Sequence, residues 1–288
     1  MKNKKIFLLK TPKTGGSTFA GILRRIADNY QLQTISEVNV LVYKTLEEIE
    51  HSIIAQNITI DQIDVLCNHM QYNSTLIEQI LGPNYFRVGL IRETVSRALS
   101  GYYHSRNFNS FCPELSLKDW PNNCHHFHNG LAAWFVDRSK GPRSFLKNVK
   151  EFDHIILSDR FTESLLVFMH KMNLKLTDLL YVQAKKTTSK KKKKEMTPNE
   201  SKQFEKTILG KNTYDVQMYQ HANRTLTKEY NSLPNYYSQM KEIFEEMLLD
   251  VQKVCSTVED FRDCYWGDNG CAKTCIKNWI HDNVKCPE

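Results

Sequence analysis

A short apolar run, a glycine turn and an amphipathic segment follow one another at the amino end of this 288-residue chain. The apolar run is residues 6–9 (IFLL), and it is broken by Pro12 and by the pair Gly15-Gly16. Apolar residues then recur at the i, i+3, i+4, i+7 spacing of a helix; they are Phe19, Ile22, Leu23, Ile26 and Tyr30. This order predicts a strand, a tight turn and a helix, which is the unit from which α/β folds are built.

The turn has the chemistry of an anion site. The first N–H groups of a helix lack partners inside the helix, and the helix dipole adds partial positive charge there. Gly15 and Gly16 lack a Cβ, so the backbone can come close to a phosphate. Lys13 adds a charge and three donors, and Ser17 and Thr18 can cap the helix or bind phosphate oxygens. The alternative is an ordinary turn with a solvated lysine.

The order of the residues in the turn excludes a Walker A motif, in which the lysine follows the second glycine. Residues 12–18 (PKTGGST) instead resemble the 5′-phosphosulfate loop of Golgi-type sulfotransferases, and residues 7–18 resemble the galactose-3-O-sulfotransferases most. Those enzymes use 3′-phosphoadenosine 5′-phosphosulfate (PAPS) as sulfuryl donor, and we expect the reaction in this chain to require no metal. The resemblance implies that PAPS is bound by Lys13, Thr14, Gly15, Gly16, Ser17 and Thr18.

A second segment, residues 92–103, follows a predicted strand and opens a helix. It resembles the family's 3′-phosphate motif, which implies that Arg92 and Ser100 hold the 3′-phosphate of the donor. A guanidinium forks onto a phosphate dianion well. The family often has Asp-Pro after the arginine, where this chain has Glu93-Thr94. Arg92 in a surface ion pair is the alternative, and Arg97 is either a second phosphate ligand or a surface charge.

His69 lies at the end of a predicted strand, in a stretch (residues 67–70) that resembles the one carrying the family's proposed catalytic base. An imidazole can take the proton of an attacking hydroxyl near neutral pH. We therefore expect His69 and Lys13 to be catalytic, with Lys13 stabilising charge on the departing phosphate. A structural histidine is the alternative for His69.

One departure concerns the acceptor. The galactose-3-O branch commonly has His directly before the loop lysine, whereas this chain has Pro12, which is usual in the uronyl 2-O-sulfotransferase relatives. We expect PAPS-dependent transfer of a sulfuryl group to the 3-OH of galactose in a glycolipid or glycan. The alternatives are a uronyl 2-O-sulfotransferase of glycosaminoglycans and an inactive, sulfotransferase-like glycan-binding protein; the lysine order disfavours a nucleotide kinase.

Strand and helix patterns alternate along the chain, which predicts an α/β fold with a central parallel sheet and helices on both faces. The resemblance implies the P-loop-like sulfotransferase fold. Lys13, His69 and Arg92 each follow a predicted strand, at the sheet edge where α/β folds bind ligands. The main strands are expected at residues 6–9, 33–35, 38–43, 64–68, 85–91 and 154–157, and 178–182 is an edge strand or a turn. Helices are expected at residues 46–56, 74–81, 94–103, 129–136, 142–149, 162–172, 197–210, 215–230 and 236–255.

The eight cysteines divide the chain unevenly. Five of them lie in the last 34 residues, and we place a sulfotransferase domain at residues 1–255 and a cysteine-rich tail at 256–288. The tail spacings match a zinc site poorly and favour disulfides in an oxidising compartment. Four glycosylation sequons, at Asn57, Asn73, Asn199 and Asn223, agree with this, and the resemblance implies the Golgi lumen.

Charge and hydropathy limit the partners. The formal net charge is +7, which suits a polyanionic donor, an acidic acceptor or peripheral contact with a membrane surface. Part of the excess is a lysine run at residues 190–194, inside a segment (184–196) that we expect to be a disordered loop, and no nucleic-acid motif accompanies it. No apolar run approaches the ~20 residues of a membrane span, so we expect the membrane anchor to be absent from this chain.

The stretch that follows residues 92–103 is rich in Asn, Pro, Cys and aromatic residues. We expect residues 108–128 to form a long loop, a candidate lid. It ends in a cluster of Cys124, His125, His126 and His128, for which a metal site is conceivable. A loop lining the acceptor cleft, or plain surface, is favoured, and no metal site is expected.

Overall fold

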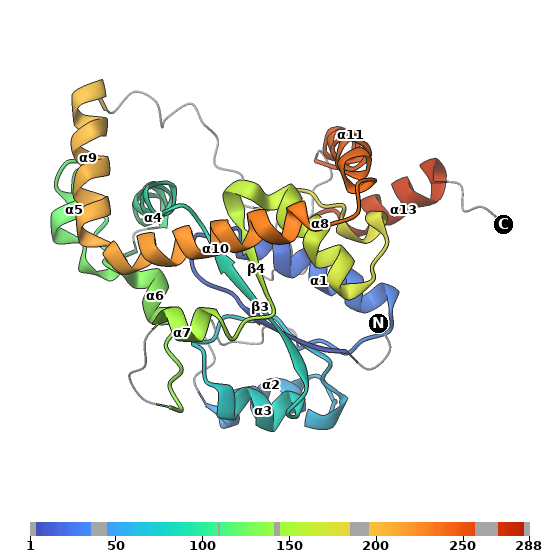
Figure 1. The fold of residues 1–288 in the computed structure, drawn as a ribbon. Coiled ribbons are helices and arrows are strands. Elements are labelled where there is room, and N and C mark those ends of the chain that lie inside the picture. The colour runs from blue at the N-terminus through green and yellow to red at the C-terminus, as the bar shows by residue number, and fades with distance from the viewer. Residues whose placement is uncertain are drawn as a thin grey trace.

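The computed structural model describes residues 4–35, 45–108, 110–140, 145–184, 196–256 and 270–284. Four parallel strands form the central sheet in the order β2-β1-β3-β4 (Figure 1). They are β1 (Lys5–Leu9), β2 (Val65–Leu66), β3 (Tyr85–Ile91) and β4 (His154–Leu157). Thr34 adds an isolated parallel bridge to Val65 beyond β2. The predicted parallel sheet is confirmed.

Helices cover both faces of the sheet, as predicted. Side chains alternate along β1, so that Ile6 and Leu8 enter one core while Phe7 and Leu9 enter the other. All four are fully buried, as is typical of a parallel strand covered on both sides. The first core is completed by α1 (Gly16–Asn29), α8 (Phe161–Met172), α11 (Tyr237–Cys255) and α13 (Lys273–Asn283). The second is completed by α2 (Leu46–Ala55), α3 (Ser74–Leu81), α6 (Gly130–Trp134) and α7 (Phe145–Val149).

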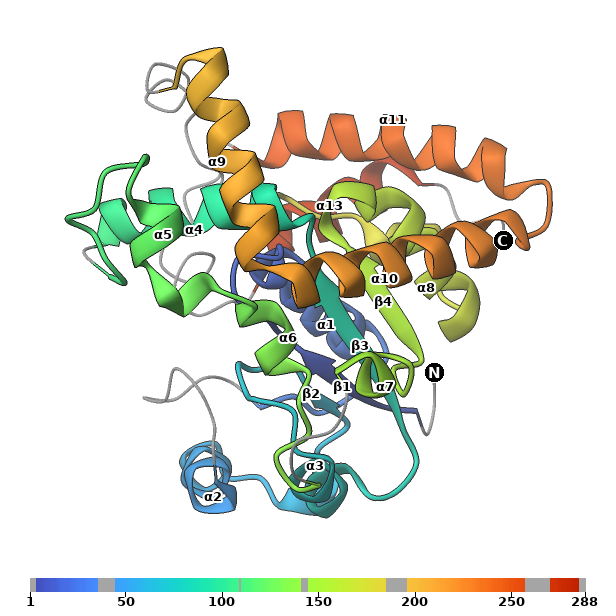
Figure 2. The ribbon, with the colours of Figure 1, turned by 60° about the vertical axis from the view of Figure 1, so that its left-hand side comes forward.

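A long helix, α10 (Thr213–Asn231), joins the parts of the fold. It runs beside β4 and contacts α6, α7 and α8 (Figure 2). Its buried residues Met218, Ala222 and Leu226 recur every four positions and pack into the second core. Helix α10 therefore packs along β4, the last strand in the order of the sheet.

Residues 108–128 differ from the expected loop. They contain α5 (Trp120–Asn123) and a 3-10 helix (His125–Phe127), packed with α4 (Thr94–Phe108) and α9 (Pro198–Lys211) at one side of the molecule (Figures 1 and 2). Trp120 is fully buried, and its ring lies 4.8 Å from that of Phe127. Pro121 favours a helix start, and a disulfide joins Cys112 to Cys124. The loop prediction holds for residues 110–119, which form no helix or strand, and is wrong for residues 120–127, where the buried aromatic contacts accompany two short helices.

Other boundaries agree closely with the sequence patterns. A capping box begins α9, where the Thr197 hydroxyl accepts from the Glu200 N–H at 3.3 Å. The N-cap of α3 is Asn73, whose side chain accepts from the Leu76 N–H at 3.0 Å. No strand forms at residues 178–182: residues 178 and 179 end a 3-10 helix (Leu176–Leu179), and residues 180–182 have no regular structure. The expected strand at 38–43 and most of the expected loop at 184–196 lie outside the described residues.

The described part of the tail is tied to the fold by a disulfide and by packing. Cys255 of α11 is bonded to Cys275 of α13, and Cys271 is also disulfide-bonded. Ile276 and Trp279 join the first core. These bonds confirm the disulfide interpretation of the tail, and the described residues include no group of three metal-ligating side chains. In the same residues, every helix is too short or too polar to cross a bilayer.

A buried histidine gives the fold a pH dependence. His154 is enclosed at the start of β4, where its Nε2–H donates to the Ser164 carbonyl at 2.9 Å and its Nδ1 lies 3.6 Å from the Glu229 carboxylate. Burial lowers the pKa of His154 below its ordinary value of 6.5, and this outweighs the opposite effect of Glu229. Lys171, which pairs with Glu229 at 2.6 Å, lowers the pKa of His154 further.

We predict that the contribution of neutral, buried His154 to the free energy of unfolding is fully present above about pH 6.5. The free energy of unfolding then decreases as the pH drops below that value. The unfolded chain then binds a proton that buried His154 does not, and one such proton costs at most about 1.4 kcal/mol per pH unit. Urea unfolding at several pH values checks this. His154→Gln should flatten the dependence between pH 5 and 6.5, and an unchanged slope in that variant would contradict the prediction.

Candidate active site

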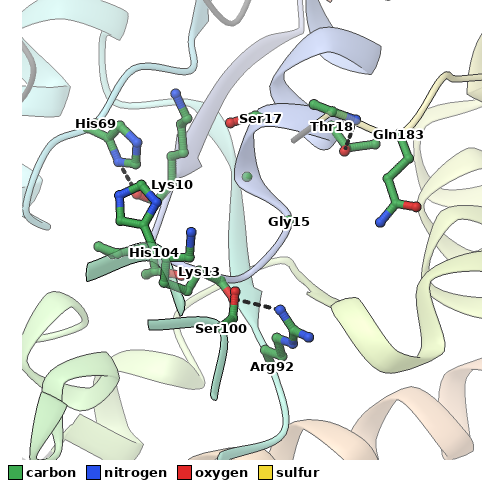
Figure 3. Close-up of a pocket in the computed structure, with 14 residues that line it drawn as sticks. Lys10, Lys13, Gly15, Ser17, Thr18, His69, Arg92, Ser100, His104 and Gln183 are labelled. Carbon is green, nitrogen blue, oxygen red and sulfur yellow. Dashed lines mark hydrogen bonds between the residues drawn. The ribbon is translucent and has the colours of Figure 1, made fainter. Parts of the chain in front are cut away.

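A cavity of about 510 Å³ opens at the carboxyl ends of β1, β2 and β3 (Figure 3). It brings together eight of the nine predicted site residues from three separate segments of the chain; the exception is Thr14. The lining residues are Lys10, Thr11, Pro12, Lys13, Gly15, Gly16, Ser17, Thr18, His69, Arg92, Ser100, His104, Gln183 and Ala184.

The loop after β1 turns sharply so that α1 begins at the cavity. Lys13 and Gly15 have φ angles of 66° and 78°, in the left-handed region, and Gly15 is the N-cap of α1. The first turn of α1 contains no acidic residue, so its N–H groups and dipole are available to an anion. A Cβ on Gly16 would lie 2.8 Å from Cγ of Lys10. Glycine at this position lets the Lys10 side chain pass beside the loop.

Hydroxyl groups hold the loop from behind. The Thr11 hydroxyl donates to the Leu90 carbonyl of β3 at 2.7 Å, and the Thr14 hydroxyl donates to the Thr11 carbonyl at 2.8 Å. Ser158, after β4, donates to the Thr14 carbonyl. Thr14 is fully buried, so its side chain supports the loop rather than lining the cavity. The loop is thereby fixed to two neighbouring strand ends.

Arg92 follows β3 directly and reaches the loop. Its Nη1 donates to the Lys13 carbonyl at 3.3 Å, which places the guanidinium beside the turn (Figure 3). Burial lowers the pKa of Arg92, and the nearby Asp159 and Glu93 partly offset that effect. Glu93 accepts hydrogen bonds from two N–H groups at the start of α4, at 2.7 and 2.8 Å. Glu93, which stands where the family often has Asp, thus caps the start of α4.

Arg97 is neither of the two expected alternatives. It is buried, and its Nη2 lies 2.6 Å from the Asp215 carboxylate of α10. Asp215 also accepts from the N–H groups of Leu131 and Ala132 at the start of α6. This ion pair joins α4, α6 and α10 behind the cavity. Arg97 therefore positions the helix that carries Ser100.

His69 faces the cavity from the segment after β2. Its Nδ1 lies 2.8 Å from the Lys10 carbonyl, and since a carbonyl only accepts, Nδ1 carries the hydrogen. In the neutral ring the lone pair is then on Nε2. The ring of Trp134 contacts His69 edge-on, with the ring centres 6.2 Å apart. The imidazole is oriented on two sides and can accept a proton at Nε2.

Six lining residues were not among the predicted site residues, and three of them have long polar or aromatic side chains: Lys10, His104 and Gln183. His104 follows Ser100 by four residues on α4, so helical spacing could have identified it. Lys10 is 1% exposed, and its place directly after β1 was a usable signal. Gln183 had no local signal. Its segment is placed by Arg25, which donates to three carbonyls between residues 177 and 180, and by the Ala184 N–H, which donates to the Thr18 hydroxyl.

The charges around the cavity have one sign. Lys10, Lys13 and Arg92 line it, and none of the described residues that line it is acidic. Cations and helix N–H groups around one space suit a ligand with several negative charges.

Comparisons with known proteins agree with this geometry. The sequence matches the galactose-3-O-sulfotransferase family over residues 1–154, which is more than half of the chain and includes every predicted site residue. It is 20% identical to galactose-3-O-sulfotransferase 2 of Mus musculus over 285 residues, a span that covers 87% of this chain and 69% of the mouse protein. The chain belongs to the galactose-3-O-sulfotransferase family and is a carbohydrate sulfotransferase.

Proposed function

We propose that this enzyme transfers a sulfuryl group from PAPS to the 3-OH of galactose in a glycolipid or glycan. The observation that carries the proposal is the cavity at the carboxyl ends of β1 to β3, with three cations, two imidazoles and no acidic side chain among its described lining residues. A donor with a phosphosulfate and a separate phosphate matches that charge.

The donor would be held at two places. Lys13 and the N–H groups at the start of α1 suit the 5′-phosphosulfate, since this loop has the left-handed turn and the helix N-terminus that oxyanions prefer. Arg92 and Ser100 suit the 3′-phosphate, because a fork of guanidinium donors and a hydroxyl lie on the same cavity.

The acceptor hydroxyl would be activated by His69. Nε2 takes the proton while the hydroxyl oxygen forms a bond to sulfur. The bond from sulfur to the 5′-phosphate oxygen breaks, and its electron pair stays on that oxygen, which Lys13 stabilises. The products are a sulfate ester and adenosine 3′,5′-bisphosphate, and the proton on His69 is released to solvent. No step in this sequence uses a metal.

The family match and the name of the mouse relative support galactose as the acceptor sugar. Pro12 keeps a uronyl 2-OH as the second candidate, because proline precedes the loop lysine in those relatives. The disulfides support an oxidising compartment, and we propose the Golgi lumen. We also propose that residues 1–255 form the catalytic domain, to which Cys255–Cys275 fastens the tail.

We predict that the protein transfers labelled sulfate from PAPS to glycans with terminal galactose and that the ester lies on the 3-OH. Incubation of labelled PAPS with a panel of galactosyl and uronyl acceptors, followed by NMR of the product, measures this. Transfer to uronyl sugars alone would establish the second candidate. Sugar binding without transfer to any acceptor would contradict an active enzyme.

Lys13→Ala should weaken the binding of adenosine 3′,5′-bisphosphate by roughly 10- to 100-fold and abolish turnover. A hydrogen bond to a charged group contributes about 1.5–3 kcal/mol, which corresponds to that range. Calorimetric titration gives the affinity. Lys202→Ala, which removes an exposed lysine on α9, is the matched control and should bind normally. Equal affinities in the two variants would remove the loop from the donor site.

His69→Gln should retain nucleotide affinity and lower kcat by roughly 100- to 10,000-fold, the usual contribution of a general base. Glutamine keeps an amide N–H donor and a similar size but cannot take up a proton. Steady-state kinetics, together with the same titration, separate the two effects. A variant with normal kcat would make His69 structural.

A further inference from the structure

We propose that His125 and His128 form a binding site for a divalent transition metal such as Zn²⁺, with water in the remaining positions. The site is separate from the active-site cavity and does not depend on the proposed reaction. It explains the histidine cluster that the sulfuryl-transfer chemistry leaves unused.

The distance between the two rings fits a shared ion. Nδ1 of His125 lies 3.3 Å from Nδ1 of His128. Zinc binds imidazole nitrogen at about 2.0–2.1 Å with tetrahedral angles, which places two such nitrogens roughly 3.3–3.4 Å apart. The two rings are nearly perpendicular, at 86°, with their centres 5.0 Å apart, so they approach without stacking.

The hydrogen bond on the far side of His128 prepares the ring for a metal. Its Nε2 lies 2.9 Å from the Pro121 carbonyl, so Nε2 carries the hydrogen and the lone pair is on Nδ1. Metal-binding histidines commonly donate their second N–H to a backbone carbonyl in this way, which fixes the tautomer and the ring orientation. The lone pair of His128 therefore lies on the side that faces His125.

The backbone under the pair is held in place. The two histidines are three residues apart, at the start and just after the end of the 3-10 helix, so they lie on one side of it. The disulfide Cys112–Cys124 precedes this helix, and Phe127 within it is buried. Little ordering entropy remains to be lost when a metal binds.

Solvent reaches the site. His125 is exposed and His128 is half-buried. Among the described residues no third histidine, cysteine or carboxylate completes a cluster, so the site has two protein ligands and open positions. An imidazole pair favours zinc, copper or nickel over magnesium and calcium, which prefer oxygen ligands.

The neighbouring His126 supplies a matched control. Its ring packs on Phe111 instead, with 5.0 Å between the ring centres. It is exposed and adjacent in sequence, so His126→Gln changes the local charge and composition as much as the other substitutions do.

The test is calorimetric titration of the oxidised full chain with Zn²⁺, compared with His125→Gln, His128→Gln and His126→Gln. We expect the unaltered chain to bind one equivalent of zinc. The zinc affinity should be at least about 10-fold weaker in each of the first two variants and unchanged in the third. Circular dichroism verifies that each variant is folded, and the sulfotransferase activity of His125→Gln should be normal.

Two results would overturn the proposal. Zinc affinity unchanged in both His125→Gln and His128→Gln would show that the pair only shares a proton between its two Nδ1 atoms. An equal loss in His126→Gln would show that any histidine on this surface binds the ion.

Discussion

The loop after β1 depends on hydroxyl groups that anchor it to itself and to the neighbouring strand ends. Thr11 reaches Leu90 of β3, Thr14 reaches back to Thr11, and Ser158 reaches the loop from the end of β4. Each bond satisfies a buried carbonyl that would otherwise cost free energy. The left-handed residues Lys13 and Gly15 are thereby kept in a conformation that an isolated chain would rarely adopt. The proposed contacts of Lys13 and of the first N–H groups of α1 with the 5′-phosphosulfate follow from this anchored turn.

The sequence was sufficient for the features that repeat or that lie close together in the chain. Short apolar runs gave the bounds of β3 and β4 correctly, and the expected helix at residues 197–210 matches α9 to within one residue at each end. Three strand ends marked Lys13, His69 and Arg92, and parallel topology alone brings such ends to one edge.

What the sequence could not give depends on contacts between distant segments. Arg97 and Asp215 are 118 residues apart, and nothing local shows that both are buried. Cys112 is bonded to Cys124, and Trp120 packs beside this disulfide in a small separate core. This packing orders part of a segment that was expected to be a loop. Gln183 reaches the cavity only because Arg25 binds the carbonyls that precede it. Helix and strand propensities and hydrophobic periodicity describe only neighbouring residues, so they cannot predict contacts between distant segments.

The ion pair of Arg97 and Asp215 explains how the segment at residues 92–103 is held in place. Removing two charges from water is costly, and the pair is compensated by the N–H groups of Leu131 and Ala132 on the carboxylate. A pair of this kind tolerates the loss of either partner poorly, so it keeps α4 in one position against α6 and α10. Ser100 and His104 lie on that helix and line the cavity beside Arg92. Within this one segment, therefore, Arg92 lines the cavity and Arg97 fixes the helix behind it.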